Sequence, residues 1–208
     1  MKKTLLAIAS VVILSSQVSF ADEIKECKTA QDKIDGCIEF VYRDTLAKKI
    51  EEQIPYVEGK IEGMRKWFYK DGSLGWEQPY IQGKAEGLQK IYYPSGAIKI
   101  EETYKDDLVE GLTKWYYESG KLYREVPNQN GFKNGVEKWY YENGTILQEI
   151  SYVNGKKDGV ENKYDENGKL TATRTFKEGD LLKGKCANGK DMTEQDIENF
   201  KKFQPYCK

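Results

Sequence analysis

The chain has no histidine and only four cysteines among its 208 residues. Histidine is the usual general base of hydrolases and the commonest metal ligand in proteins, so its absence removes both roles. The cysteines form no C-x-x-C pair, and the chain has neither a G-x-S-x-G nucleophile elbow nor a phosphate-binding glycine loop. We therefore expect no catalytic residues, no metal site and no cofactor.

Long apolar runs are also missing, apart from residues 5–14. Two lysines precede this run and Ala21 follows it among small residues, which is typical of a secretory signal, here residues 1–21, cleaved after Ala21. The run is too short to span a bilayer, and the next residue is Asp22 rather than the cysteine of a lipid anchor. We predict an exported protein, periplasmic or secreted; a retained N-terminal anchor is the alternative.

Neither sign of charge is in excess: the chain has 33 basic and 34 acidic residues, a net charge of −1. Without residues 1–21, which contain two lysines and no acid, the counts are 31 (33 − 2) and 34, a net charge of −3. This balance gives no reason to expect a nucleic acid partner. The 15 tyrosines and 4 tryptophans dominate an apolar fraction of 38%, which predicts a thin sheet rather than a deep two-layer core.

The chain does contain a repeat. Glycine recurs every 24 residues, and each copy opens a similar unit, the clearest being GVEKWYYENGTILQEISYVNGKKD. A fixed period of this size indicates one small supersecondary unit stacked on copies of itself. We predict an array over residues 38–184, made of five clear units and a degenerate sixth copy before them. The five phase glycines are Gly63, Gly87, Gly111, Gly135 and Gly159.

Each unit carries a dipeptide ending in glycine, such as Asp71-Gly72, between aromatic and aliphatic runs. This pattern is typical of two-residue β-hairpin loops with positive φ. We therefore predict an all-β protein, an elongated single-layer antiparallel sheet of consecutive hairpins. Partner numbers then sum to 143 in the first unit, so Tyr69 should face Leu74. The same arithmetic pairs Trp67 with Trp76, Lys66 with Glu77, Lys90 with Glu101, Lys114 with Glu125, and Lys138 with Glu149.

This register sorts the side chains, because alternate residues of a strand point to opposite faces. One face should carry the Lys–Glu pairs beside an aromatic row of Phe68, Tyr92, Tyr116, Tyr140 and Tyr164. The other should gather tryptophans and tyrosines, and an exposed aromatic surface of this extent favours binding. Its candidate residues are Trp67, Tyr69, Tyr93, Trp115, Tyr117, Trp139 and Tyr141. Periodicity does not say which face is the more exposed.

The third unit departs from the others at residues 127–132, where Asn128 replaces the Tyr or Phe of the other copies. Asn128 and Phe132 are therefore candidates for a local specialised site. Drift without function explains the departure at least as well.

The regularly spaced glutamates raise the alternative of a carboxylate hydrolase. Equivalent residues one repeat apart lie two strand spacings, about 9.5 Å, from each other, with a lysine row between them. A retaining glycosidase needs about 5 Å between its carboxylates, and an inverting one needs an acid of raised pKa, which a neighbouring ammonium opposes. A solvated ladder of charges is the favoured interpretation.

All four cysteines lie outside the five clear units, Cys27 and Cys37 before them and Cys186 and Cys207 after them. In an oxidising compartment an even count indicates structural disulfides, and three pairings are possible. The local pairing would crosslink two end segments, an N-terminal cap at residues 22–37 and a C-terminal cap at residues 185–208.

The C-terminal cap should include a short helix over residues 194–203. Thr193 stands at the N-cap position and Asp196 at the capping-box position. Ile197, Phe200 and Phe203 then lie on one helix face, which we expect to cover the last strand. Lys201 and Lys202 alone make a weak basic face, so an end cap is favoured over a membrane-surface helix.

The phrases GLTKWYYESGKL, GVEKWYYENGTIL and SYVNGKKDG resemble the MORN-repeat variant family of bacteria, some members of which are named YwqK-type antitoxins. The resemblance covers roughly residues 56–184. It implies an elongated sheet of hairpins that contacts proteins or lipids and does not catalyse. The antitoxin name fits poorly with export, because neutralising a cytosolic toxin requires staying inside the cell.

The chain is therefore expected to be a non-catalytic interaction or scaffold module, in one form immunity-like, with another protein as its partner. The alternative is a cell-wall module that binds glycan or choline, since flat aromatic rows suit sugar rings and methylammonium groups. The sequence leaves the identity of the partner and the oligomeric state open.

Overall fold

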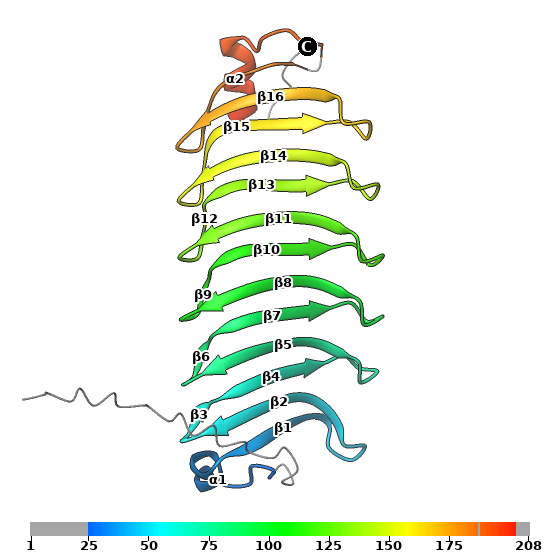
Figure 1. The fold of residues 1–208 in the computed structure, drawn as a ribbon, viewed down its shortest axis with the longest axis vertical. Coiled ribbons are helices and arrows are strands. Elements are labelled where there is room, and N and C mark those ends of the chain that lie inside the picture. Colours follow the sequence, from blue (N-terminus) through cyan, green and yellow to red (C-terminus); the bar gives the residue numbers. More distant parts are fainter. Residues whose placement is uncertain (1–24, 187, 203–208) are drawn as a thin grey trace, which may run out of the picture.

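In the computed structural model, which describes residues 25–186 and 188–202, the chain forms a single antiparallel sheet of 17 strands with a short helix at each end (Figure 1). This confirms the predicted fold class. The elements are α1 Ala30–Asp35, β1 Cys37–Asp44, β2 Lys49–Val57, β3 Lys60–Ile61, β4 Gly63–Phe68, β5 Leu74–Ile81, β6 Lys84–Ala85, β7 Gly87–Tyr92, β8 Ile98–Lys105, β9 Leu108–Val109, β10 Gly111–Tyr116, β11 Leu122–Gln129, β12 Phe132–Lys133, β13 Gly135–Tyr140, β14 Ile146–Val153, β15 Lys156–Tyr164, β16 Leu170–Lys177, β17 Asp180–Gly184 and α2 Glu194–Lys201.

The long strands follow one another as an uninterrupted series of hairpins. β7 pairs with β8, β8 pairs with β10, and the same pattern recurs in each period. The degenerate first copy forms the hairpin of β1 and β2. The short strands β3, β6, β9 and β12 extend the pairing of the preceding strand just before a phase glycine. Each phase glycine has positive φ, +102° at Gly87, which explains why glycine recurs there.

The predicted register is correct over most of each hairpin. Trp67 pairs with Trp76 and Lys66 with Glu77, and the three later Lys–Glu pairs are also cross-strand neighbours. The predicted facing of Tyr69 and Leu74 is wrong. A β-bulge after Trp67 shifts the register by one residue, so that Phe68 pairs with Leu74.

The prediction of two-residue loops at Asp71-Gly72 and its copies is also wrong. Gly72 N–H donates to the Tyr69 carbonyl at 3.0 Å and Tyr69 N–H donates to the Ser73 carbonyl at 2.8 Å, which encloses a three-residue loop. Gly72 has positive φ but Asp71 does not. This geometry is a type I turn followed by a glycine bulge, the usual form of a three-residue hairpin loop.

The two-residue turns lie at the opposite ends of the strands. Asn130 and Gly131 have φ of +51° and +79° and join the paired residues Gln129 and Phe132. Positive φ at both loop positions defines a type I′ turn, which matches the twist of the strands. Equivalent turns recur at residues 58–59, 82–83, 106–107, 154–155 and 178–179.

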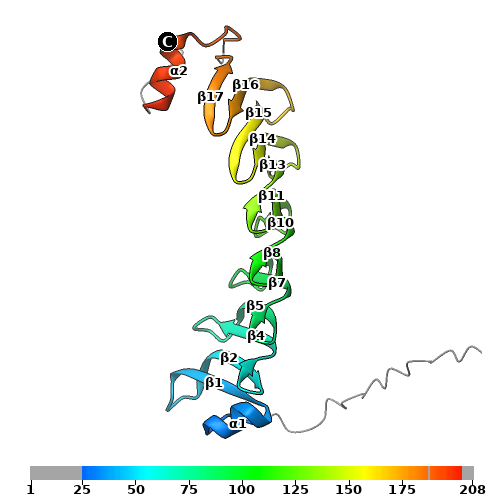
Figure 2. The same ribbon diagram turned by 90° about the vertical axis from the view of Figure 1, so that its left-hand side faces the viewer.

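We call the two surfaces of the sheet the tryptophan face, which carries Trp67, Trp115 and Trp139, and the lysine–glutamate face, which carries the Lys–Glu pairs. Both helices contact residues of the tryptophan face. Lys33 of α1 lies over the Tyr56 ring at 4.4 Å, and the Phe200 ring of α2 lies 6.4 Å from that of Phe176. Figure 2 shows the strands in one layer, with α2 standing off one side of it.

The C-terminal helix has the predicted capping box, since Thr193 and Asp196 exchange both hydrogen bonds. Ile197 and Phe200 pack against a small core, which confirms that the helix covers the end of the array. Phe203 lies outside the described residues. The core consists of Phe176, Leu181, Cys186 and Met192.

The N-terminal segment also caps its end. Cys27 N–H donates to the Ile38 carbonyl at 2.9 Å and Ile38 N–H donates to the Lys25 carbonyl at 2.8 Å, which occupies the outer edge of β1. The sequence analysis did not anticipate α1, whose N-cap Thr29 forms a capping box with Asp32.

Cys27 and Cys37 form a disulfide with a Cα–Cα distance of 5.2 Å. Cys186 is buried, but Cys207 and residues 1–21 lie outside the described residues, so the second pairing and the cleaved signal stay predictions. Over the described ranges, we find no helix with the length and apolarity needed to cross a bilayer.

Candidate binding faces of the sheet

The tryptophan face is built around a row of cross-strand neighbours. Trp67, Trp76 and Ile91 are successive partners at one end, and Trp115, Arg124 and Trp139 are successive partners further along. All three tryptophans predicted for binding are half-buried. The structure therefore brings them onto one face, as the sequence indicated.

The guanidinium of Arg124 occupies the slot between two of these rings. Its central carbon lies 4.5 Å from the Trp115 ring centroid and 4.4 Å from that of Trp139. Tyr123 contacts Trp139 and Tyr117 edge to face, with centroids 5.2 Å and 5.0 Å apart. The aromatic slot that could hold a methylammonium group is thus filled by a cation of the chain itself.

The predicted tyrosines have a structural role in addition to any binding role. Tyr69 hydroxyl donates to the carbonyl of Tyr92, in the next repeat, at 2.7 Å. Tyr93, Tyr117 and Tyr141 repeat this bond to the carbonyls of Tyr116, Tyr140 and Tyr164 at 2.8 to 2.9 Å. Their hydroxyls therefore join successive hairpins. Their half-buried rings are the part of each side chain that is available for contact with a partner.

Two carboxylates are buried on the tryptophan face, and each is held by two cations. Glu137 is 1% exposed and accepts hydrogen bonds from Arg124 Nε at 2.7 Å and Lys133 Nζ at 2.8 Å. Burial alone would raise the pKa of Glu137, but Lys133 and Arg124 together hold it below its ordinary value. A carboxyl kept ionised in this way is unsuited to be the general acid of a hydrolase.

Glu161 repeats this arrangement one period later. It accepts from Lys157 Nζ at 2.6 Å and from Arg174 Nη1 at 2.7 Å. Burial alone would raise the pKa of Glu161, but Lys157 and Arg174 together hold it below its ordinary value. Sequence reasoning missed both clusters, although the Lys-x-x-x-Glu spacing from Lys133 to Glu137 and from Lys157 to Glu161 was visible.

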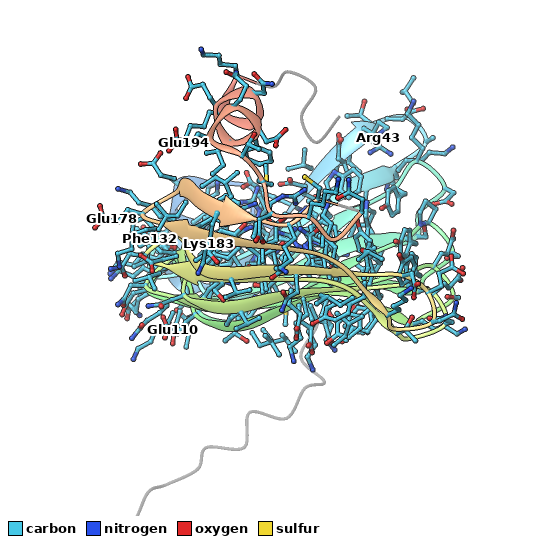
Figure 3. All side chains as sticks on the ribbon, turned by 90° about the horizontal axis from the view of Figure 1, so that it is seen from above. Arg43, Glu110, Phe132, Glu178, Lys183 and Glu194 are labelled. Carbon is cyan, nitrogen blue, oxygen red and sulfur yellow. A yellow bond between two sulfur atoms is a disulfide. The ribbon has the colours of Figure 1, made fainter. Side chains whose placement is uncertain are left out.

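The structure does not bring Asn128 and Phe132 together. Asn128 lies on the tryptophan face, where its Nδ2 donates to Thr113 Oγ1 at 2.9 Å and to the Val126 carbonyl at 3.0 Å. Phe132 is 59% exposed and pairs with Gln129, on the opposite face. Phe132 follows the two-residue turn of Asn130 and Gly131, and Figure 3, which looks along the stack, shows it at the same end of the strands as Glu178. The sequence analysis had placed both residues in one local site. The structure corrects this, because side chains alternate along β11 and β12 and the two residues lie on opposite faces.

The lysine–glutamate face carries a charge ladder that crosses the strands. Its eight members alternate in sign from strand to strand, and neutral Gln53 and Asn162 follow at the two ends. In order they are Lys66, Glu77, Lys90, Glu101, Lys114, Glu125, Lys138 and Glu149. Among the described residues, no ion pair joins these lysines to these glutamates.

Tyrosine hydroxyls, rather than lysines, hold the glutamates of the ladder. Tyr116 donates to Glu101 Oε2 at 2.7 Å. The pKa of Tyr116 is raised to about 12, mainly by burial and secondly by this hydrogen bond. Tyr92, Tyr140 and Tyr164 bind Glu77, Glu125 and Glu149 in the same way at 2.7 to 3.1 Å. The ammonium groups of the lysines are thus available to other charges.

An apolar stripe runs beside the ladder on the same face. It consists of the residue after each phase glycine, and each of these side chains is 40% to 44% exposed. Sequence reasoning missed it, although an apolar residue follows every phase glycine. The stripe residues are Met64, Leu88, Leu112, Val136 and Val160.

The fold and its two faces define a β-hairpin repeat protein with a binding role. The chain contains four consecutive repeats that match the model of the MORN repeat variant family, at residues 85–106, 109–130, 133–154 and 157–178. Three of these segments begin at a short strand and all four end at the first residue of a two-residue turn. Repeats of this family are generally non-catalytic and often bind proteins. A comparison with curated proteins gave no significant match.

Proposed function

We propose that this chain is an exported, non-catalytic module that binds another protein through its tryptophan face. The observation that carries the proposal is the cluster of Trp115, Arg124 and Trp139, stacked at 4.4 to 4.5 Å and extended by Tyr117 and Tyr123. Tryptophan, tyrosine and arginine are the residues that most often dominate protein–protein binding energies. The cluster is rigid before binding, because Glu137 fixes the guanidinium, so little ordering opposes association.

Export is supported by the Cys27–Cys37 disulfide, since such bonds persist in oxidising compartments. The expected leader is residues 1–21. Mass spectrometry of the exported chain should therefore give a mature form that begins at Asp22 and contains this disulfide. A protein whose cysteines are reduced in the cell would contradict export, and one that keeps residues 1–21 would contradict cleavage of the leader.

A protein partner is favoured over choline because Arg124 already fills the slot between the tryptophans. Both helices also contact the ends of this face, so a partner reaches it between them. A rigid surface between two end caps suits a folded protein. An immunity-like role would be one form of this function.

The test is capture of partners from the producing cell by the exported chain, followed by measurement of affinity for the captured protein. Trp115→Ala and Trp139→Ala should each weaken binding at least tenfold, which is typical of a hot-spot residue. The matched control is Leu112→Ala, on the opposite face, which should bind normally. Circular dichroism must show native strand content in each variant, and Trp67→Ala, in a different repeat, replaces any variant that fails to fold.

Binding that survives both tryptophan substitutions in folded protein would contradict the proposal. Capture by cell walls that soluble glycan or choline competes would show the glycan-binding alternative instead.

A further inference from the structure

The lysine–glutamate face combines three features that the proposed function does not use. They are the charge ladder from Lys66 to Glu149, the apolar stripe from Met64 to Val160, and a row of tyrosines bonded to the glutamates. Neither helix covers this face, because α1 and α2 contact Tyr56 and Phe176 of the tryptophan face. Figure 3, which looks along the stack, shows α2 on one side of the strands only.

We propose that a second copy of this chain packs face to face on the lysine–glutamate face, around a two-fold axis that runs parallel to the strands between β8 and β10. This position is the centre of the ladder, between Glu101 and Lys114. A rotation about such an axis reverses the order of the strands but keeps each residue at its place along the strand. The ladder of one copy therefore lies over the ladder of the other, and stripe lies over stripe.

The charges become complementary at every position of the ladder. Because the ladder has eight members and alternates in sign, reversing it places each lysine over a glutamate. Lys114 lies over the second copy's Glu101, and the neutral flank Gln53 lies over Asn162. The resulting pairs are Lys66 with Glu149, Glu77 with Lys138, Lys90 with Glu125, and Glu101 with Lys114.

Self-complementarity of this kind is what a two-fold interface requires, since the same patch must serve both copies. A ladder of one sign would instead favour an oppositely charged partner or surface. Here the signs cancel within the face, so it has no net attraction for an anionic membrane or a polyanion. The lysines also lack intrachain ion pairs among the described residues, so they can bind the carboxylates of the second copy.

The area is sufficient for a stable dimer. The ladder spans seven strand spacings, about 34 Å, and six-residue strands are about 20 Å long, which gives about 700 Å² of sheet for each copy. Covering this face on both copies buries about 1,400 Å², within the range of specific interfaces. The apolar stripe beside the ladder provides the hydrophobic contribution, and sheets pack face to face at about 10 Å.

Sedimentation equilibrium of the exported chain tests the proposal. The expected result is a dimer at micromolar concentration, which becomes a monomer in the variant Leu88→Glu/Leu112→Glu. The matched control is Leu46→Glu, at a side chain that is 98% exposed and outside the face, and it should remain dimeric. A monomeric native chain at 100 times this concentration would overturn the proposal, as would a dimer unaffected by the double substitution.

Reversing the charge of single ladder residues tests the register of the two copies. These substitutions leave the residues of the apolar stripe unchanged. Lys114→Glu and Glu101→Lys should each weaken self-association on the order of tenfold or more, because like charges then face each other. An equimolar mixture of the two variants should restore a native-strength heterodimer, since every position is again complementary. Failure of the mixture to recover would overturn this arrangement of the copies. Trp115→Ala should remain dimeric, so the failure of this proposal and the failure of partner binding are distinguishable.

Discussion

Arg124 Nε donates to Glu137 Oε1 at 2.7 Å across two neighbouring strands, and only 2% of the glutamate side chain is exposed. The same guanidinium lies over the rings of Trp115 and Trp139. The aromatic layer is therefore anchored by a buried ion pair beneath it. In a one-layer sheet, which has no second layer of apolar side chains, this network takes the place of an ordinary core at the centre of the array.

Removing the buried carboxylate should cost much of the local stability. Glu137→Ala leaves Arg124 and Lys133 without their shared anion, and breaking a buried pair from one side typically costs about 3 to 5 kcal/mol. Because Lys133 is partly exposed and water can solvate it, we expect Glu137→Ala to lower the free energy of unfolding by about 3 kcal/mol, the low end of this range. Urea denaturation followed by tryptophan fluorescence measures this change, since the cation lies against two tryptophans.

The control for Glu137→Ala is Lys84→Ala. It removes the ion pair between Lys84 and Asp106, whose side chains are 57% and 64% exposed. An exposed pair of this kind contributes less than about 1 kcal/mol. Equal effects of the two substitutions would show that burial of Glu137 is not what makes it important.

The tyrosines predict a loss of stability at high pH. Burial and neighbouring glutamates raise the pKa of Tyr104, Tyr116 and Tyr152 from 10.0 to about 12. Between these values the unfolded chain has released phenolic protons that the folded chain still holds. Stability is therefore fully present below pH 10 and falls as the pH rises toward 12. The thermal midpoint should fall progressively across this range.

Tyrosinate absorbance provides the matching measurement. In the folded chain it should appear at higher pH than in the same chain unfolded in urea, because the unfolded tyrosines have their ordinary pKa. Coincident titration curves for the two states would contradict the role assigned to the Tyr–Glu bonds.

Much of this architecture could be predicted because every unit has the same sequence pattern, so that an inference made for one hairpin applies to all of them. The interval between phase glycines predicted one hairpin per unit, and the opposition of Lys66 and Glu77 followed from alternation. The predicted length of the loop after this strand was wrong, because a β-bulge after Trp67 adds a residue without changing the pattern of apolar residues. Asn143-Gly144 and Asn154-Gly155 look alike in sequence, yet only the second forms a two-residue turn.

The functional surfaces were less accessible to prediction than the fold. The aromatic residues were placed on the correct face, but the ion pair between Arg124 and Glu137 joins residues 13 apart through pairing of neighbouring hairpins. Only the register between repeats brings them together. The apolar stripe could have been found, because an apolar residue follows every phase glycine and alternation places it on the same face as the lysine two residues further on in four of the five units.

A phase glycine should tolerate substitution less well than a loop glycine, although both have positive φ. A Cβ added at Gly135, where φ is +121°, would lie 2.9 Å from Pro127 Cγ, whereas a Cβ at Gly144, where φ is +90°, meets nothing within 4 Å. Gly144→Ala should therefore cost only the backbone strain, roughly 1 kcal/mol. Gly135→Ala adds a collision with a ring on the neighbouring strand, and overpacking of this kind costs about 1 to 3 kcal/mol more.

Urea denaturation of both variants in the native background, and again with Pro127→Ala, separates the two effects. Removing the proline ring should recover most of the additional cost of Gly135→Ala, because the clash is then absent, and should leave the cost of Gly144→Ala unchanged. Equal costs for the two glycine substitutions would show that positive φ alone selects glycine at the phase positions. In that case close approach of successive hairpins would play no part in the 24-residue period.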